Sequence, residues 1–122
     1  MKILVVEDET LLAQAMVTAL EWEFDKPVDL AVDGQSALDF TNQQDYDLAV
    51  LDWSIPPPTG IELIALWRQT GSVRHILMLS AWDREDTRRQ ALAAGADIFL
   101  TKPLSLIDLR ARARELVSGE SD

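Results

Sequence analysis

The chain has 122 residues, of which 48% are hydrophobic, and this is enough for one packed core but too little for two ordinary domains. Its formal net charge of −10 and its pI near 4.4 disfavour direct binding to nucleic acid, whose phosphates are held by clustered Lys and Arg. The lack of cysteine and the single histidine, His75, exclude disulfides and thiolate or imidazole metal cages, so a bound metal would have oxygen ligands.

The sequence has no signal-peptide pattern and no apolar stretch of membrane-spanning length, so we expect a cytoplasmic protein without membrane attachment. We place one domain at residues 1–118 and a tail at residues 119–122. Basic residues gather in the C-terminal third, where solvated helix faces and a partner surface are equally good interpretations. These residues are Arg84, Arg88, Arg89, Lys102, Arg110, Arg112 and Arg114.

Short apolar runs alternate with segments of helical periodicity along the whole chain. In chain order, the predicted elements are strand 3–6 and helix 11–20, strand 28–32 and helix 36–42, strand 48–51 and helix 60–69, strand 75–79 and helix 83–94, and strand 97–100 and a helix from 105. This alternation is typical of the α/β class, with a doubly wound five-stranded parallel sheet and helices on both faces.

Turn and cap residues mark the boundaries of these elements. Asp33 and Gly34 predict a turn and helix cap, Asp83 predicts a cap, and Ser105 with Asp108 fits a capping box. The inward-facing side chains are predicted to be Leu11, Leu12, Ala15, Met16, Ala19 and Leu20 in the first helix, Ile61, Ile64 and Trp67 in the third, and Leu106, Leu109 and Leu116 in the last. Three prolines at 56–58 exclude helix and strand from the loop after the third strand, because each fixes φ and removes a donor.

Polar residues follow four of the predicted strands: Glu7 and Asp8 the first, Asp52 the third, Ser80 and Ala81 the fourth, and Thr101, Lys102 and Pro103 the fifth. The carboxyl ends of parallel strands meet at one edge of the sheet, so we expect these groups to converge there. Clustered carboxylates raise one another's pKa unless a cation lies among them, which predicts a hard divalent metal, Mg²⁺. Asp52 is central and would be the nucleophile of an in-line phosphoryl transfer, with the lysine and the hydroxyl opposite.

Each of these residues also has a plainer interpretation. Glu7 and Asp8 are suited to a helix N-terminus, and Asp52 to a turn before the prolines. Ser80 could be an ordinary strand-end hydroxyl and Lys102 a solvated lysine. The coincidence of polar groups at four strand ends favours the phosphoryl-transfer interpretation.

Four features occur together at fixed spacing: the acid pair Glu7 and Asp8, Asp52 with Pro56 and Gly60 after it, Ser80 with Ala81, and the segment 94–103 that ends in Lys102 and Pro103. In these features the chain resembles, over essentially its whole length, the receiver domain of bacterial two-component response regulators. The resemblance implies a flavodoxin-like sheet with strand order 2-1-3-4-5. It further implies that a histidine kinase or phosphotransfer protein phosphorylates Asp52.

Roles for the site residues also follow from the resemblance. Asp8, Asp52 and the main-chain carbonyl of Ser54 would ligate Mg²⁺, with Glu7 acting mainly through water. Lys102, in a cis peptide bond to Pro103, would pair with the Asp52 carboxylate and then with the phosphoryl oxygens.

The resemblance also implies a switch: the Ser80 hydroxyl would move to the phosphoryl group, and Phe99 would turn inward. The surface of the fourth helix, fifth strand and fifth helix would then change shape for a partner. Such a chain is not an enzyme beyond its own phosphorylation and slow autodephosphorylation. Trp82, two residues past Ser80, is hypothesised to shield the phosphoryl group from water; the alternative is a plain surface aromatic.

The partners of such a chain are left partly open. It would be either a stand-alone regulator or a receiver whose C-terminal output domain is absent from this sequence. A homodimer through the surface of the fourth helix, fifth strand and fifth helix is also conceivable, although Ile98 stands where many regulators carry an acid that feeds salt bridges across that dimer.

Two rival functions can be compared with this one. A Mg²⁺-dependent phosphohydrolase of the haloacid dehalogenase type needs a second aspartate two residues after the nucleophile, and Ser54 stands there instead. A receiver that signals by partner binding alone would keep the same fold, but every phosphorylation residue is present here. P-loop and dinucleotide-binding motifs are absent from the sequence.

Overall fold

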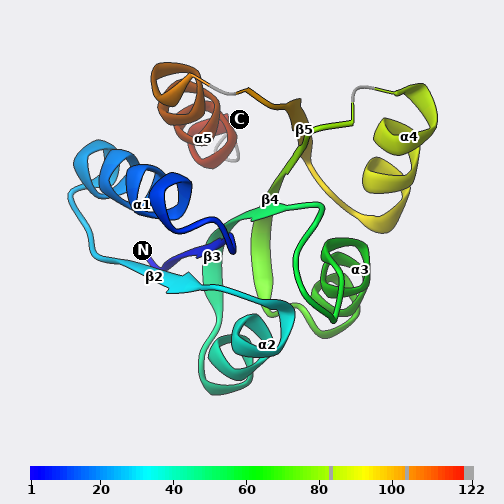
Figure 1. Ribbon diagram of the computed structural model, residues 1–122. Coiled ribbons are helices and arrows are strands. Elements are labelled where there is room, and N and C mark those ends of the chain that lie inside the picture. Colours follow the sequence, from blue (N-terminus) through cyan, green and yellow to red (C-terminus); the bar gives the residue numbers. More distant parts are fainter. Residues whose placement is uncertain (83, 104, 120–122) are drawn as a thin grey trace.

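The computed structural model describes residues 1–82, 84–103 and 105–119, in which strands and helices alternate (Figure 1). The strands are β1 (Ile3–Val6), β2 (Val28–Ala31), β3 (Tyr46–Asp52), β4 (Val73–Ser80) and β5 (Ile98–Thr101). The helices are α1 (Thr10–Phe24), α2 (Gly34–Gln43), α3 (Gly60–Thr70), α4 (Glu85–Ala94) and α5 (Leu106–Gly119). The predicted α/β class is confirmed.

All five strands are parallel, in the order β2-β1-β3-β4-β5, which is the order implied by the resemblance. Helices α1 and α5 cover one face of the sheet, and α2, α3 and α4 cover the other (Figure 1). Crossover helices on both faces explain why β1 is buried along its whole length, as a central parallel strand must be.

Alternate residues of the central strands feed two separate cores. In β3, Leu48 and Val50 pack with α1 and α5, whereas Ala49 and Leu51 pack with the other three helices. The second of these cores also contains Trp67 of α3, whose indole Nε1 donates a hydrogen bond to Thr41 of α2. The sheet is therefore packed against helices on both of its faces.

Two side chains that were predicted to pack inward lie at the surface, so the prediction is wrong for Leu11 and Leu106. Leu11 is 80% exposed, because the buried stripe of α1 runs through Ala13, Met16 and Leu20. Leu11 precedes Ala13 by two residues, which is about 200° of rotation around a helix. Leu106 is the first residue of α5 and is left exposed where that helix begins.

The helix ends follow local chemistry. The Asp33 side chain accepts a hydrogen bond from the Ser36 amide at 2.7 Å, as expected for the cap of α2, and Thr59 with Glu62 forms a reciprocal capping box on α3. Helix α4 begins after Arg84 without a side-chain capping bond, and Asp83, the predicted cap, lies outside the described residues.

Two X-Pro peptide bonds are cis: Lys102–Pro103, as the resemblance implied, and Pro57–Pro58 in the loop after β3. At the other end of the chain, α5 continues to Gly119, one residue past the predicted domain end at 118. Within the described residues, none of the helices has the length and hydropathy needed to cross a bilayer.

Candidate functional site

The ends of four strands bring the predicted site residues to one edge of the sheet. The parallel register pairs Val6 with Leu51, so that Glu7 and Asp8 emerge beside Asp52. It also pairs Ser80 with Thr101, which places Lys102 next to the end of β4. Pairing between neighbouring strands, rather than proximity in sequence, assembles the site.

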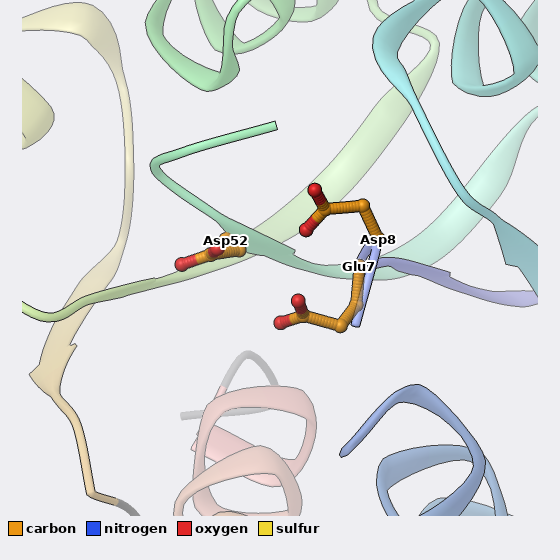
Figure 2. Close-up of side chains that lie close together, drawn as sticks. All are labelled: Glu7, Asp8 and Asp52. Atoms are coloured by element: carbon orange, nitrogen blue, oxygen red, sulfur yellow. The ribbon is translucent and has the colours of Figure 1, made fainter. Parts of the chain in front are cut away.

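Three carboxylates form a cluster at this edge: Glu7, Asp8 and Asp52 (Figure 2). Each offers an oxygen atom, and these oxygen atoms all lie within 4.8 Å of one another. Glu7 is 1% exposed and Asp52 is 6% exposed, whereas Asp8 is open to solvent. The cluster is therefore accessible from the side of Asp8 and closed beneath by the two buried carboxylates.

Lys102 bridges the two buried carboxylates. Its Nζ lies 3.2 Å from Glu7 Oε1 and 3.3 Å from Asp52 Oδ1. The pairing with Asp52 agrees with the expected role of Lys102. The hydrogen bond to Glu7 was not foreseen, because nothing in the local sequence links two residues 95 positions apart.

Burial raises the pKa of both Glu7 and Asp52, because a carboxylate loses hydration in a poorly solvated site. For Asp52 the nearby Lys102 ammonium opposes the rise without cancelling it, and the negative charge of Asp8 adds to it. Burial by itself lowers the pKa of Lys102, but the charges of Asp52 and Glu7 outweigh it, so the pKa of Lys102 is raised. Lys102 therefore stays protonated.

The donor set fits a hard divalent cation. Three carboxylates against one ammonium leave two uncompensated negative charges when all are ionised, and every donor offered by the cluster is an oxygen. A cation of charge +2 bound there would offset the repulsion from Asp8 that adds to the rise in the pKa of Asp52. Ser54, whose carbonyl was predicted as a third protein ligand, lies in the loop two residues beyond Asp52.

The Ser80 hydroxyl is fully buried at the end of β4, and its oxygen accepts a hydrogen bond from the Trp82 amide at 2.9 Å. The Trp82 side chain is 50% exposed, and the Arg84 guanidinium lies 5.2 Å from the centroid of its ring. The main-chain amide of Trp82 thus binds the Ser80 hydroxyl, while the indole of Trp82 is half exposed beside the Arg84 guanidinium.

Phe99, the predicted switch aromatic, is buried at 3% exposure. The Arg88 guanidinium of α4 covers it, 5.0 Å from the ring centroid, and donates a hydrogen bond to the Phe99 carbonyl at 3.4 Å. In the sequence, Arg88 stands among seven basic residues of the C-terminal third, and nothing there singles it out. The contact spans two elements, and no sequence signal could have identified it.

Known proteins resemble this chain along nearly all of its length. The sequence matches the response regulator receiver domain family over residues 3–114. It is 42% identical to the response regulator RppA of Synechocystis sp. over 118 residues, which cover 95% of this chain and 50% of RppA. It is 36% identical to the transcriptional regulatory protein PmrA of Pectobacterium parmentieri, covering 96% of this chain and 52% of PmrA.

The fold has close counterparts among solved structures. The receiver domain of the Francisella response regulator 1452 superposes with a TM-score of 0.89 and 34% sequence identity, covering 98% of both chains. The chain spans about half the length of the curated relatives it matches. Because the family match covers nearly the whole chain, the chain belongs to the response regulator receiver domain family.

Proposed function

We propose that this receiver domain accepts a phosphoryl group on Asp52 from a histidine kinase or phosphotransfer protein, in a reaction that requires Mg²⁺. The observation that carries the proposal is the position of the Lys102 ammonium, 3.3 Å from Asp52 Oδ1, beside a cluster of three carboxylates. The names of the relatives, response regulators and transcriptional regulatory proteins, support a role in two-component signalling.

In the proposed step an Asp52 carboxylate oxygen attacks the phosphorus atom of a phosphohistidine. The new oxygen–phosphorus bond forms as the nitrogen–phosphorus bond breaks, and the leaving imidazole takes up a proton. Lys102 holds the carboxylate beforehand and the phosphoryl oxygens afterwards, and the Ser80 hydroxyl donates to the same group. The chain acts as a stoichiometric acceptor whose acyl phosphate is slowly hydrolysed, rather than as an enzyme with sustained turnover.

Four groups would hold the metal. Asp8, Asp52 and the Ser54 carbonyl would ligate it directly, and Glu7, which is engaged by Lys102, would contribute through water. Held there, Mg²⁺ would supply positive charge that offsets the negative charge of the phosphoryl group. The exposed Asp8 gives the ion a route into the cluster from solvent.

Phosphorylation is proposed to act on the surface of α4, β5 and α5 through Ser80 and Phe99. Since the curated relatives are about twice as long as this chain, the partner of that surface is proposed to be an output domain joined to the receiver. A homodimer through the same surface is the alternative output, and Ile98 removes one of the acids that such a dimer uses elsewhere in the family.

The test is phosphorylation by acetyl phosphate with and without Mg²⁺, followed by intact mass measurement. We expect one phosphoryl adduct per wild-type chain, dependent on Mg²⁺ and absent from Asp52→Asn. Absence of the adduct in the wild type would reduce the chain to a receiver that signals by binding alone. Continuous release of phosphate at high turnover would instead indicate a phosphohydrolase.

A further inference from the structure

Gly34, the first residue of α2, lies directly against the loop that follows Asp52. Its amide donates a hydrogen bond to the Pro56 carbonyl at 2.9 Å. A Cβ atom on Gly34 would overlap the carbonyl oxygen of Pro58 and lie 2.5 Å from the Pro58 nitrogen. All of these atoms belong to the main chain, so the loop cannot yield by rotating a side chain.

Three consecutive residues of the loop between β3 and α3 are prolines. Prolines at 56, 57 and 58 offer no amide donors, so residues 56–58 can accept hydrogen bonds but cannot donate them. The Gly34 amide is one of the free donors at the start of a helix, and it is available for the Pro56 carbonyl without loss of a helical bond. This contact fixes the distal half of the loop.

The proximal half of the loop is anchored separately. The Trp53 amide donates to the Leu79 carbonyl of β4 at 2.7 Å, and the Ile55 side chain is buried in the core at 7% exposure. Ser54 lies between these two anchors. Ile55 alone separates Ser54 from Pro56, whose carbonyl the Gly34 amide holds. Because the three prolines have fixed φ and can adjust only through ψ, a displacement forced at Pro58 would strain the short segment that carries Ser54.

We infer that Gly34 is a positioning residue for the cation site: its amide and its missing side chain let the loop close onto α2 and so set the direction of the Ser54 carbonyl. The inference rests on the proposed function, in which that carbonyl is a metal ligand. Gly34 itself touches no ligand and acts through Pro56 and Pro58.

The test compares Mg²⁺ affinity in three chains by isothermal titration calorimetry. Gly34→Ala is expected to raise the Mg²⁺ Kd about tenfold or more, as substitutions of residues that orient metal ligands typically do. Circular dichroism should show that the variant is folded. Gly71→Ala is the matched control, since Gly71 has a φ of 75° and open space around its Cβ position. That variant should lose stability through backbone strain and keep a wild-type Kd to within about twofold.

Hydrogen exchange of the wild-type chain provides a second measurement that does not depend on the folding of Gly34→Ala. If the Gly34 contact sets the ligand, bound Mg²⁺ must in turn stabilise that contact, because coupling is reciprocal. Exchange of the Gly34 amide should therefore slow on addition of Mg²⁺. The Gly71 amide, bonded to the Trp67 carbonyl at 2.8 Å in a different part of the chain, should not change.

The outcomes separate the two claims. A wild-type chain that binds no Mg²⁺ overturns the proposed function and the inference together. Wild-type binding with an unchanged Kd in Gly34→Ala overturns the inference alone, as does equal weakening in both glycine variants, which would indicate general destabilisation. Unaltered exchange of the Gly34 amide on Mg²⁺ binding also overturns it.

Discussion

Lys102 lies within 3.3 Å of two buried carboxylates, so its charge competes with any cation at the same site. We expect Lys102→Gln to tighten Mg²⁺ binding by about tenfold, since a positive charge at hydrogen-bond distance from a ligand carboxylate is removed. The same change should slow phosphorylation by about 10²-fold, because the phosphoryl oxygens lose a charged donor.

Calorimetry and acetyl phosphate labelling measure the two effects of Lys102→Gln separately. Lys2→Gln is the matched control, because Lys2 precedes β1 at the opposite end of that strand. Weaker Mg²⁺ binding in Lys102→Gln would show that the lysine orders the cluster instead of competing with the ion.

Trp82 contributes its amide to Ser80 and leaves its indole half exposed beneath Arg84. If the indole shields the phosphoryl group from water, Trp82→Ala should shorten the lifetime of phosphorylated Asp52 several-fold. The hydrogen bond from the main-chain amide of residue 82 to the Ser80 hydroxyl should persist, because it does not involve the indole. The lifetime is measured by loss of the phosphoryl adduct in intact mass spectra. Trp22→Ala alters another exposed tryptophan, on α1, and should leave it unchanged; an unaltered lifetime in Trp82→Ala would end the hypothesis.

At the scale of elements, Arg68 joins α3 to the strands beside it. Its guanidinium donates to the carbonyls of Gly95, Val73 and Arg74 and to the carboxylate of Asp97. The Asp97 carboxylate in turn accepts the Ile76 amide of β4 at 2.8 Å. One side chain thus ties α3 to the start of β4 and to the turn that precedes β5.

Removing this connection should destabilise the fold without affecting the chemistry. We expect Arg68→Ala to lower the free energy of unfolding by about 1–3 kcal/mol, because several carbonyls and a carboxylate lose a charged donor. Urea denaturation measures the change. Arg112→Ala, which removes an exposed pair with Glu115, should cost less than about 0.5 kcal/mol; similar losses in the two variants would contradict the assignment.

At the scale of the whole molecule, the acidic cluster links stability to pH and to metal. Burial raises the pKa values of Glu7 and Asp52 in the folded chain. Between the ordinary carboxylate pKa and these raised values, the folded chain therefore binds more protons than the unfolded chain. Without metal, stability should therefore fall as the pH rises from the ordinary carboxylate pKa through the raised values, and stay low above them.

Thermal denaturation at neutral pH in a chelator checks this sign. Asp52→Asn should melt above the wild type, by ~4 °C for each kcal/mol of relief. Adding Mg²⁺ at one hundred times its Kd should then raise the free energy of unfolding of the wild type by about 2.7 kcal/mol, and its Tm accordingly, with little effect on the variant. Asp45→Asn, at an exposed position before β3, is the control. A variant that melts below the wild type in chelator would contradict the sign.

The proposed switch also belongs to the whole molecule, because it couples Asp52 to a surface on α4, β5 and α5. Shifting a two-state equilibrium from mostly inactive to mostly active takes about 5.5 kcal/mol of differential stabilisation, which several charge-assisted bonds to one phosphoryl group can supply. Phe99 is already buried beneath the Arg88 guanidinium. The open question about the switch is whether the contact between Arg88 and the Phe99 ring changes on phosphorylation.

The sequence by itself determined the order of the elements and the residues at the strand ends. Alternating apolar runs and helical spacing are local patterns, and turn chemistry at Asp33 and Gly34 marks where a strand ends and the next helix begins. Once the strands are parallel, their carboxyl ends meet at one edge. Asp52 and Lys102 could therefore be predicted as neighbours without coordinates.

Only the tertiary structure decided which of these groups touch, and how each helix is rotated. The bond from Lys102 to Glu7, the Arg88 cover over Phe99 and the contact of Gly34 with the proline loop all join segments that no local pattern relates. The exposure of Leu11 has the same origin, because packing of α1 against the sheet selected one of several apolar stripes. Spacing along a chain encodes periodicity, whereas contacts between elements depend on side-chain volumes that meet only in the folded molecule.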